Sequence, residues 1–109
     1  YLLGRAFFSQ KKYTQALEKL HLACSLSLKN KEMECYAPCM LYSARAFYEL
    51  EKWEEAKPLF EYVITNGKSY NNAEYGEAAQ KLFVSYNKTG DARKTAVLFN
   101  KFDEKDFEK

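Results

Sequence analysis

The chain has 109 residues, of which 47% are hydrophobic and 29% charged, and this balance excludes wholesale disorder. Its net charge of +2, with no sustained basic stretch, excludes an obligate nucleic-acid or anionic-membrane partner. No run approaches the ~20 apolar residues that a membrane-spanning helix needs. Nine Tyr and eight Phe against four Gly and two Pro favour long, well-packed helices over a turn-rich β fold. The apolar start without an initiator Met predicts a piece of a longer protein.

The first part of the chain shows the spacing of amphipathic helices. Apolar residues recur at helical spacing over 2–7 and again over 16–28, on either side of a polar break at 10–12. Pro38 suits the first turn of the next helix, where a missing N–H costs nothing, and the apolar stripe continues to Tyr48.

The second part continues in the same way. A polar break at 51–52 precedes a stripe over 53–63, in which Pro58 predicts a helix that either starts late or kinks. Asn66-Gly67 is typical of a helix C-cap, and Asn71-Asn72 can cap a helix over 73–87. Thr89-Gly90-Asp91 is expected to form the turn into a last helix.

These stripes repeat along the chain. A pattern of large and small apolar residues returns after 40 residues and again after 39. Its members are Leu3, Gly4, Phe7, Tyr13, Ala16, Leu20 and Ala23, then Ser43, Ala44, Phe47, Trp53, Ala56, Phe60 and Val63, then Leu82, Phe83, Tyr86, Ala92, Thr95, Phe99 and Phe102. The small residues predict close approach of the two helices in each copy, with Gly4 near Ala16 in the first.

On these residues the chain resembles the tetratricopeptide repeats, which are pairs of helices that stack into a right-handed superhelix. The resemblance implies an all-α solenoid of three antiparallel helix pairs in a single domain over 1–109. The repeats would cover about 1–31, 32–71 and 72–104, with a charged tail at 103–109. The copies are longer than the family's usual unit of about 34 residues. The surplus is expected between helix pairs, at 29–36 and 68–75.

The resemblance implies a non-catalytic, cytoplasmic scaffold that binds a protein or peptide and needs no cofactor. The family's concave groove is built by the first helix of each pair, and its flanks are covered by adjacent repeats of the parent chain. Carried onto this sequence, the groove residues are Arg5, Phe8, Tyr42, Arg45, Tyr48, Lys81, Val84 and Asn87. Arg side chains beside aromatic rings suit an acidic or aromatic peptide segment. An alternative is the peptide-sensing part of a bacterial peptide-responsive regulator, whose repeats have similar spacing.

The family's chaperone-binding members hold a terminal carboxylate with Lys, Asn and Arg. Of the matching residues here, only Arg5 and Lys81 are basic, while Tyr42 and Glu77 stand at others. A chaperone co-factor of that type is therefore disfavoured.

One group of residues has the composition of a metal site. His21 and Cys24 share a helix face, and Cys35 and Cys39 can share another, so a Cys₃His zinc site is a weak alternative. The preferred interpretation is that the three Cys are small hydrophobic residues in a reducing compartment, with no metal bound. His21 is the only His, and the Glu54-Glu55 pair suits a solvated face, so no catalytic site is predicted.

Overall fold

The computed structural model describes residues 2–31, 33–91 and 93–97. Its helices are α1 (Leu2–Ser9), α2 (Tyr13–Lys29), α3 (Met33–Glu49), α4 (Trp53–Thr65) and α5 (Asn72–Thr89), with a short 3₁₀ helix, η1 (Gly67–Ser69), before α5. Residues 93–97 are also helical, and no strand occurs among the residues described. The predicted tail at 103–109, with Ala92, Phe99 and Phe102 of the third copy, lies outside the described residues.

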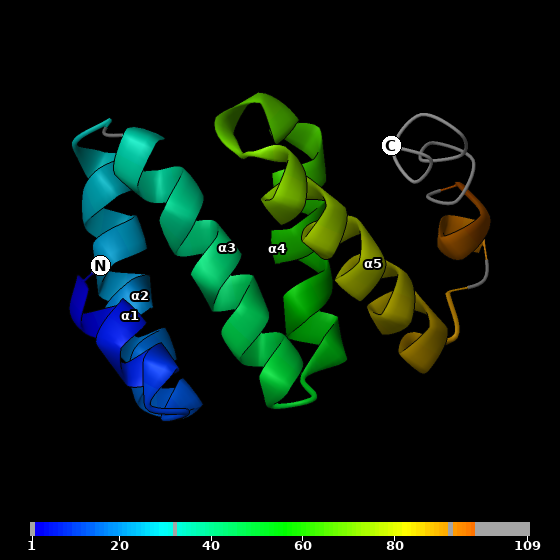
Figure 1. Cartoon of the computed structure of the whole chain (residues 1–109), viewed down its shortest axis with the longest axis horizontal. Helices are drawn as coiled ribbons and strands as arrows, with labels where there is room; N and C mark the ends of the chain where they lie inside the picture. Colours follow the sequence, from blue (N-terminus) through cyan, green and yellow to red (C-terminus); the bar gives the residue numbers. More distant parts are fainter. Residues whose placement is uncertain (1, 32, 92, 98–109) are drawn as a thin grey trace.

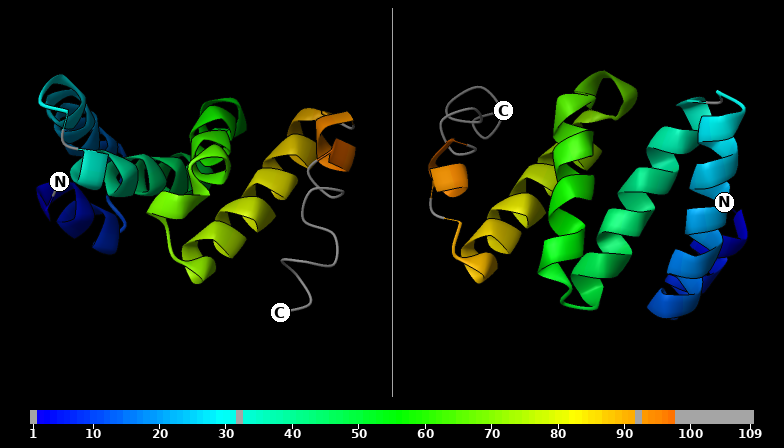
Figure 2. Two further views of the ribbon diagram at one scale, coloured as in Figure 1. Left: turned by 90° about the horizontal axis from the view of Figure 1, so that it is seen from above. Right: turned by 180° about the vertical axis from the view of Figure 1, so that it is seen from behind.

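The helices pack one after another along the chain, and each neighbouring pair runs antiparallel (Figure 1). α2 and α4 lie on one side of α3, while α1 and α5 contact α3 on the other (Figure 2, left). The predicted all-α stack of helix pairs is thus confirmed.

The turn inside each helix pair has the same geometry in all three copies. Lys11, Glu51 and Gly90 each adopt a positive φ, of 61°, 59° and 75°. The residue after each donates its backbone N–H to a carbonyl five residues back, over 2.9 Å, at Phe7, Phe47 and Tyr86. The three copies therefore share this backbone hydrogen bond as well as their sequence pattern. The predicted turn at Gly90 is confirmed. Only the third copy uses Gly, the residue that adopts this conformation without strain.

One predicted helix start is wrong, and one of the two alternatives for Pro58, a late start of its helix, is excluded. α3 begins at Met33 rather than near Pro38, so much of the surplus at 29–36 forms its first turn instead of a linker. This turn is held by tertiary contacts, because Tyr36 packs edge-on against Tyr62 and the Tyr70 hydroxyl donates to the Ala37 carbonyl over 2.6 Å. α4 starts at Trp53 without delay, although Pro58 lies inside it.

The predicted cap of α5 is confirmed. The Asn71 side chain accepts from the Glu74 N–H at 2.7 Å, and the Glu74 carboxylate accepts from the Asn71 N–H at 3.1 Å. This reciprocal capping box fixes where α5 begins and therefore the register of its side chains.

The apolar side chains form two clusters of buried residues. The larger joins α3, α4 and α5 around Phe60, Leu41 and Leu82, and the smaller joins α2 and α3 at Ala16, Leu20 and Cys39. The predicted close approach in the first pair is confirmed, because a Cβ added to Gly4 would lie 2.7 Å from Leu20 Cγ. Leu20, rather than Ala16, is the residue that Gly4 accommodates.

Candidate functional site

A row of cations and aromatic rings crosses the face formed by α1, α3 and α5. Its centre is the Tyr42 ring on α3, whose centroid lies 5.2 Å from the Arg5 guanidinium carbon and 5.0 Å from that of Arg45. Phe8 packs edge-on against the same ring at 5.5 Å. Helical spacing explains the row, because Arg5 and Phe8 share a face of α1 and Tyr42 and Arg45 share a face of α3.

Arg45 links this row of side chains to α5. Its guanidinium donates two hydrogen bonds to the Glu77 carboxylate, from Nε at 2.7 Å and from Nη2 at 2.6 Å. Lys81 Nζ donates to the same carboxylate at 3.0 Å. Partial burial opposes the charged form of both partners, yet these hydrogen bonds lower the pKa of Glu77 and raise the pKa of Arg45.

The row ends at Tyr48, which ties it to the core. Lys81 Nζ lies 5.1 Å from the Tyr48 ring centroid, and this ring packs edge-on against Trp53 and Phe60. We call the whole row the ladder, and its members are Arg5, Phe8, Tyr42, Arg45, Glu77, Lys81 and Tyr48. The ladder therefore spans three helices and is fixed to the buried cluster at one end.

The ladder unites six of the eight residues that the sequence predicts for the groove. Val84, half-buried, and Asn87, exposed, lie further along α5 and are not among its contacts. Glu77 is absent from the predicted set, although it fills the Arg45 fork. The sequence places Glu77 on the same face as Lys81 and at a position matching the family's carboxylate-binding set, but its pairing with Arg45, 32 residues away, was not predicted.

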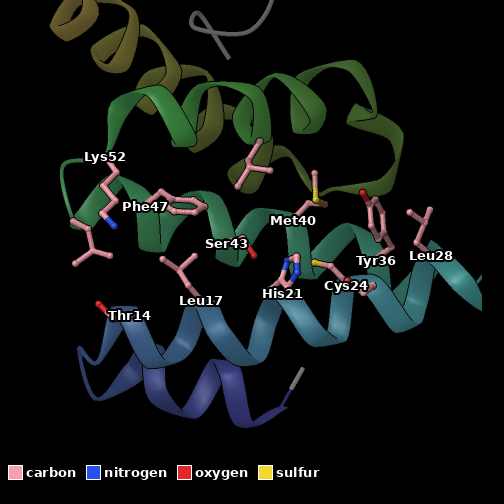
Figure 3. Close-up of a pocket in the computed structure, with 13 residues that line it drawn as sticks. Thr14, Leu17, His21, Cys24, Leu28, Tyr36, Met40, Ser43, Phe47 and Lys52 are labelled. Atoms are coloured by element: carbon pink, nitrogen blue, oxygen red, sulfur yellow. The ribbon is translucent and has the colours of Figure 1, made fainter.

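A second feature lies on the other side of α3. A groove of about 510 Å³ runs between α2 and α4 with α3 as its floor (Figure 3). Its described lining is mostly apolar: Thr14, Leu17, His21, Cys24, Ser25, Leu28, Tyr36, Met40, Ser43, Phe47, Leu50, Lys52 and Leu59. We call it the α2–α4 groove.

The residues of the zinc alternative are only partly described. His21 is exposed at the groove, Cys24 is half-buried, and Cys39 is fully buried, while the Cys35 side chain lies outside the described residues. Burial and the neighbouring Cys39 raise the pKa of Cys24 to about 12, which keeps its thiol protonated. Within the described part of the chain, no three His, Cys, Asp or Glu residues come together as metal ligands.

Comparison with known protein families finds a match to the centre of the chain. Residues 39–66, which form most of α3 and all of α4, match the family described as Tetratricopeptide repeat. Searches of curated proteins and of solved structures gave no match. None of the described helices combines the length and the apolar character needed to cross a membrane. Repeats of this kind are generally protein-interaction modules rather than catalysts. The match supports a tetratricopeptide repeat assignment for the α3–α4 pair, and the stack of helix pairs with its recurring turn is consistent with a repeat solenoid of this kind.

Proposed function

We propose that the ladder face is a scaffold surface that binds a peptide segment of a partner protein, and that acidic and aromatic side chains dominate this segment. The observation that supports it best is the placing of two guanidinium groups about one aromatic ring, Tyr42. Arg and Tyr are the residue types that most often carry binding energy at protein interfaces. The Arg and Tyr residues of the ladder lie on α1 and α3, and Lys81 continues it on α5, so an extended segment can contact three successive first helices in turn.

The charge of the ladder favours an acidic segment. Arg5, Arg45 and Lys81 bring three positive charges to this face, and Glu77 neutralises one of them. An incoming carboxylate relieves the repulsion among the cations, and a bidentate bond to Arg is among the stronger charge-assisted contacts. The rings of Phe8 and Tyr42 then offer edges and faces to an aromatic side chain.

The two arginines are not equivalent in this proposal. The Arg45 fork already holds Glu77, and its side chain is only 17% exposed, whereas Arg5 is exposed. Arg5 is the more exposed of the two, whereas a ligand carboxylate must displace Glu77 to reach Arg45. We therefore expect Arg5 to contribute attraction and Glu77 to limit affinity for acidic segments.

This proposal is tested with fluorescein-labelled dodecapeptides that alternate Glu with Phe or Lys with Phe, titrated by anisotropy. We expect Arg5→Glu to weaken binding of the Glu–Phe peptide by about tenfold, since a lost charge pair becomes a repulsion. Glu77→Gln should strengthen binding of the Glu–Phe peptide, because it removes the carboxylate that competes for Arg45. Lys12→Glu makes the same charge change away from the ladder and serves as the control.

Two results would contradict the proposal: equal affinity for the two peptides, or equal weakening by Arg5→Glu and Lys12→Glu. Circular dichroism melting of each variant separates a loss of binding from a loss of folding. The peptide-sensing alternative, the cytoplasmic location and the covering of the flanks by adjacent repeats stay predictions.

A further inference from the structure

We propose that the α2–α4 groove is a second binding site, independent of the ladder, and that it takes a medium-chain fatty acid. The apolar chain would lie along Leu17, Met40 and Phe47, and the carboxylate would meet Lys52. No contact of the ladder is used, because Tyr42 and Arg45 lie on another side of α3 from Met40 and Phe47.

The volume and lining of the groove suit a small ligand. Its volume of about 510 Å³ falls within the range of about 300–1,000 Å³ that small-molecule sites occupy. Flexible apolar side chains, such as Leu17, Leu59 and Met40, adapt to an alkyl chain and remove it from water.

The charges of the groove select the head group. Lys52 and Thr14 lie at one end, and Tyr36 and Leu28 lie at the other (Figure 3). None of the described lining residues is Asp or Glu, and Lys52 forms no ion pair with any residue that the structure describes. A ligand with one acidic end and one apolar end therefore matches the groove along its length.

The equivalent groove one repeat further on has a different set of charges. It lies between α4, α5 and residues 93–97, and its volume is about 450 Å³. By the repeat spacing, Glu61 stands where His21 stands, and Tyr86 where Phe47 stands. Tyr86 donates a hydrogen bond to the Glu61 carboxylate across this groove. Arg93 and Lys94 also line this second groove, so its charges are mixed, whereas Lys52 has no acidic neighbour in the described lining of the first groove.

The experiment is calorimetric titration of the whole chain with decanoate, below its micelle concentration, and with decylammonium as the charge-reversed probe. We expect saturable binding of decanoate and severalfold weaker binding of decylammonium, because reversing the ligand's charge turns the attraction to Lys52 into a repulsion. Lys52→Met keeps the length of the side chain and removes its charge. For a partly exposed ion pair, we expect this variant to bind decanoate about twofold to fivefold more weakly.

Lys12→Met is the matched control. Lys12 occupies the same position of its repeat with nearly the same backbone, φ −95° and ψ 71° against −91° and 73° at Lys52, but is not among the groove's described lining residues. The Lys12→Met variant should bind decanoate with the same affinity as the parent chain. Met40→Trp fills the groove and should abolish binding, with circular dichroism showing that the variant is folded. Binding that is unsaturable, equal for both probes, or weakened equally by the two Lys variants would overturn the proposal.

Discussion

The first helix pair and the remainder of the stack are built on the same repeat but are buried to different extents. Leu3, Leu22 and Leu26 of α1 and α2 are 53%, 55% and 60% exposed. In α4 and α5, Phe60 and Leu82 are 0% and 1% exposed, within the larger cluster. Leu20 and Phe60, which are equivalent in the repeat, are both 0% exposed, so the difference lies at positions that only a neighbouring helix pair can cover.

One position of the repeat shows this directly. Leu3, Ser43 and Leu82 occupy the same position in the three copies. Ser43 and Leu82 are 7% and 1% exposed, since each lies on a helix that packs against the second helix of the preceding pair. On α1, no described helix covers that side, and Leu3 stays exposed. Stability should therefore be lower at α1 and α2 than at α4 and α5.

The strongest test of this difference in stability is to create a cavity in each buried cluster. Phe60→Ala removes the largest fully buried side chain and should cost about 3–5 kcal/mol, lowering the Tm of the whole stack. Leu20→Ala should cost about 2–5 kcal/mol but loosen mainly α1 and α2. The measurement is backbone amide hydrogen exchange, determined separately for each helix.

In the Phe60→Ala variant, exchange should rise in α3, α4 and α5 together, because they share one cluster. In the Leu20→Ala variant, it should rise in α1 and α2 and change little in α5. An equal rise in α5 in both variants would show that the two regions unfold as one unit.

A smaller effect is expected where α1 and α2 touch. A Cβ at Gly4 would lie 2.7 Å from Leu20 Cγ and 3.3 Å from its backbone nitrogen, whereas a Cβ at Gly76 meets nothing within 4 Å. We expect Gly4→Ala to lower the free energy of unfolding by about 1–2 kcal/mol through overpacking. Gly76→Ala should raise it by about 0.5–1 kcal/mol, since Ala is the better helix former.

Chemical denaturation of the two variants gives the free energies. Because the substitution is the same, helix propensity acts alike in both, and the opposite signs isolate the contact with Leu20. Stabilisation by Gly4→Ala would mean that α1 does not pack closely on α2, and that the first pair is looser than the structure shows.

The sequence was sufficient for features that depend on local spacing. The helix pairs, the turn at Gly90 and the cap at Asn71 follow from apolar periodicity and from residues a few positions apart. The start of α3 was not predictable in this way, because Pro38 argues against a helix there. Its first turn depends instead on Tyr62 and Tyr70, which lie about 30 residues further along the chain.

The candidate site shows the same limit. Equivalent positions in successive repeats place Arg5 and Arg45 on one face, so their common surroundings at Tyr42 could be expected. The filling of the Arg45 fork by Glu77 could not, since it depends on the distance and angle between α3 and α5. The α2–α4 groove likewise depends on how far α2 and α4 stand apart above α3, which no local pattern specifies.

The smallest effect concerns the ion pair that links α3 to α5 and distinguishes this region from the first pair. Glu77→Gln removes a partly buried charge from between Arg45 and Lys81, whose side chains are 17% and 26% exposed. We expect a loss of about 1 kcal/mol at pH 7, between the values for surface and buried pairs. Glu54→Gln is the control, since Glu54 is 71% exposed in its pair with Lys57 and should change stability less.

The dependence on pH identifies the cause. Because the pKa of Glu77 is lowered in the folded state, its contribution is complete above the pKa of the unfolded chain, about 4.3. It is lost as the pH falls through the lower, folded value. The difference in unfolding free energy between parent and Glu77→Gln should therefore be constant from about pH 8 to pH 5 and shrink towards pH 3. A difference that persists unchanged at pH 3 would assign the effect to packing of the side chain, and the α3–α5 link would then be steric rather than ionic.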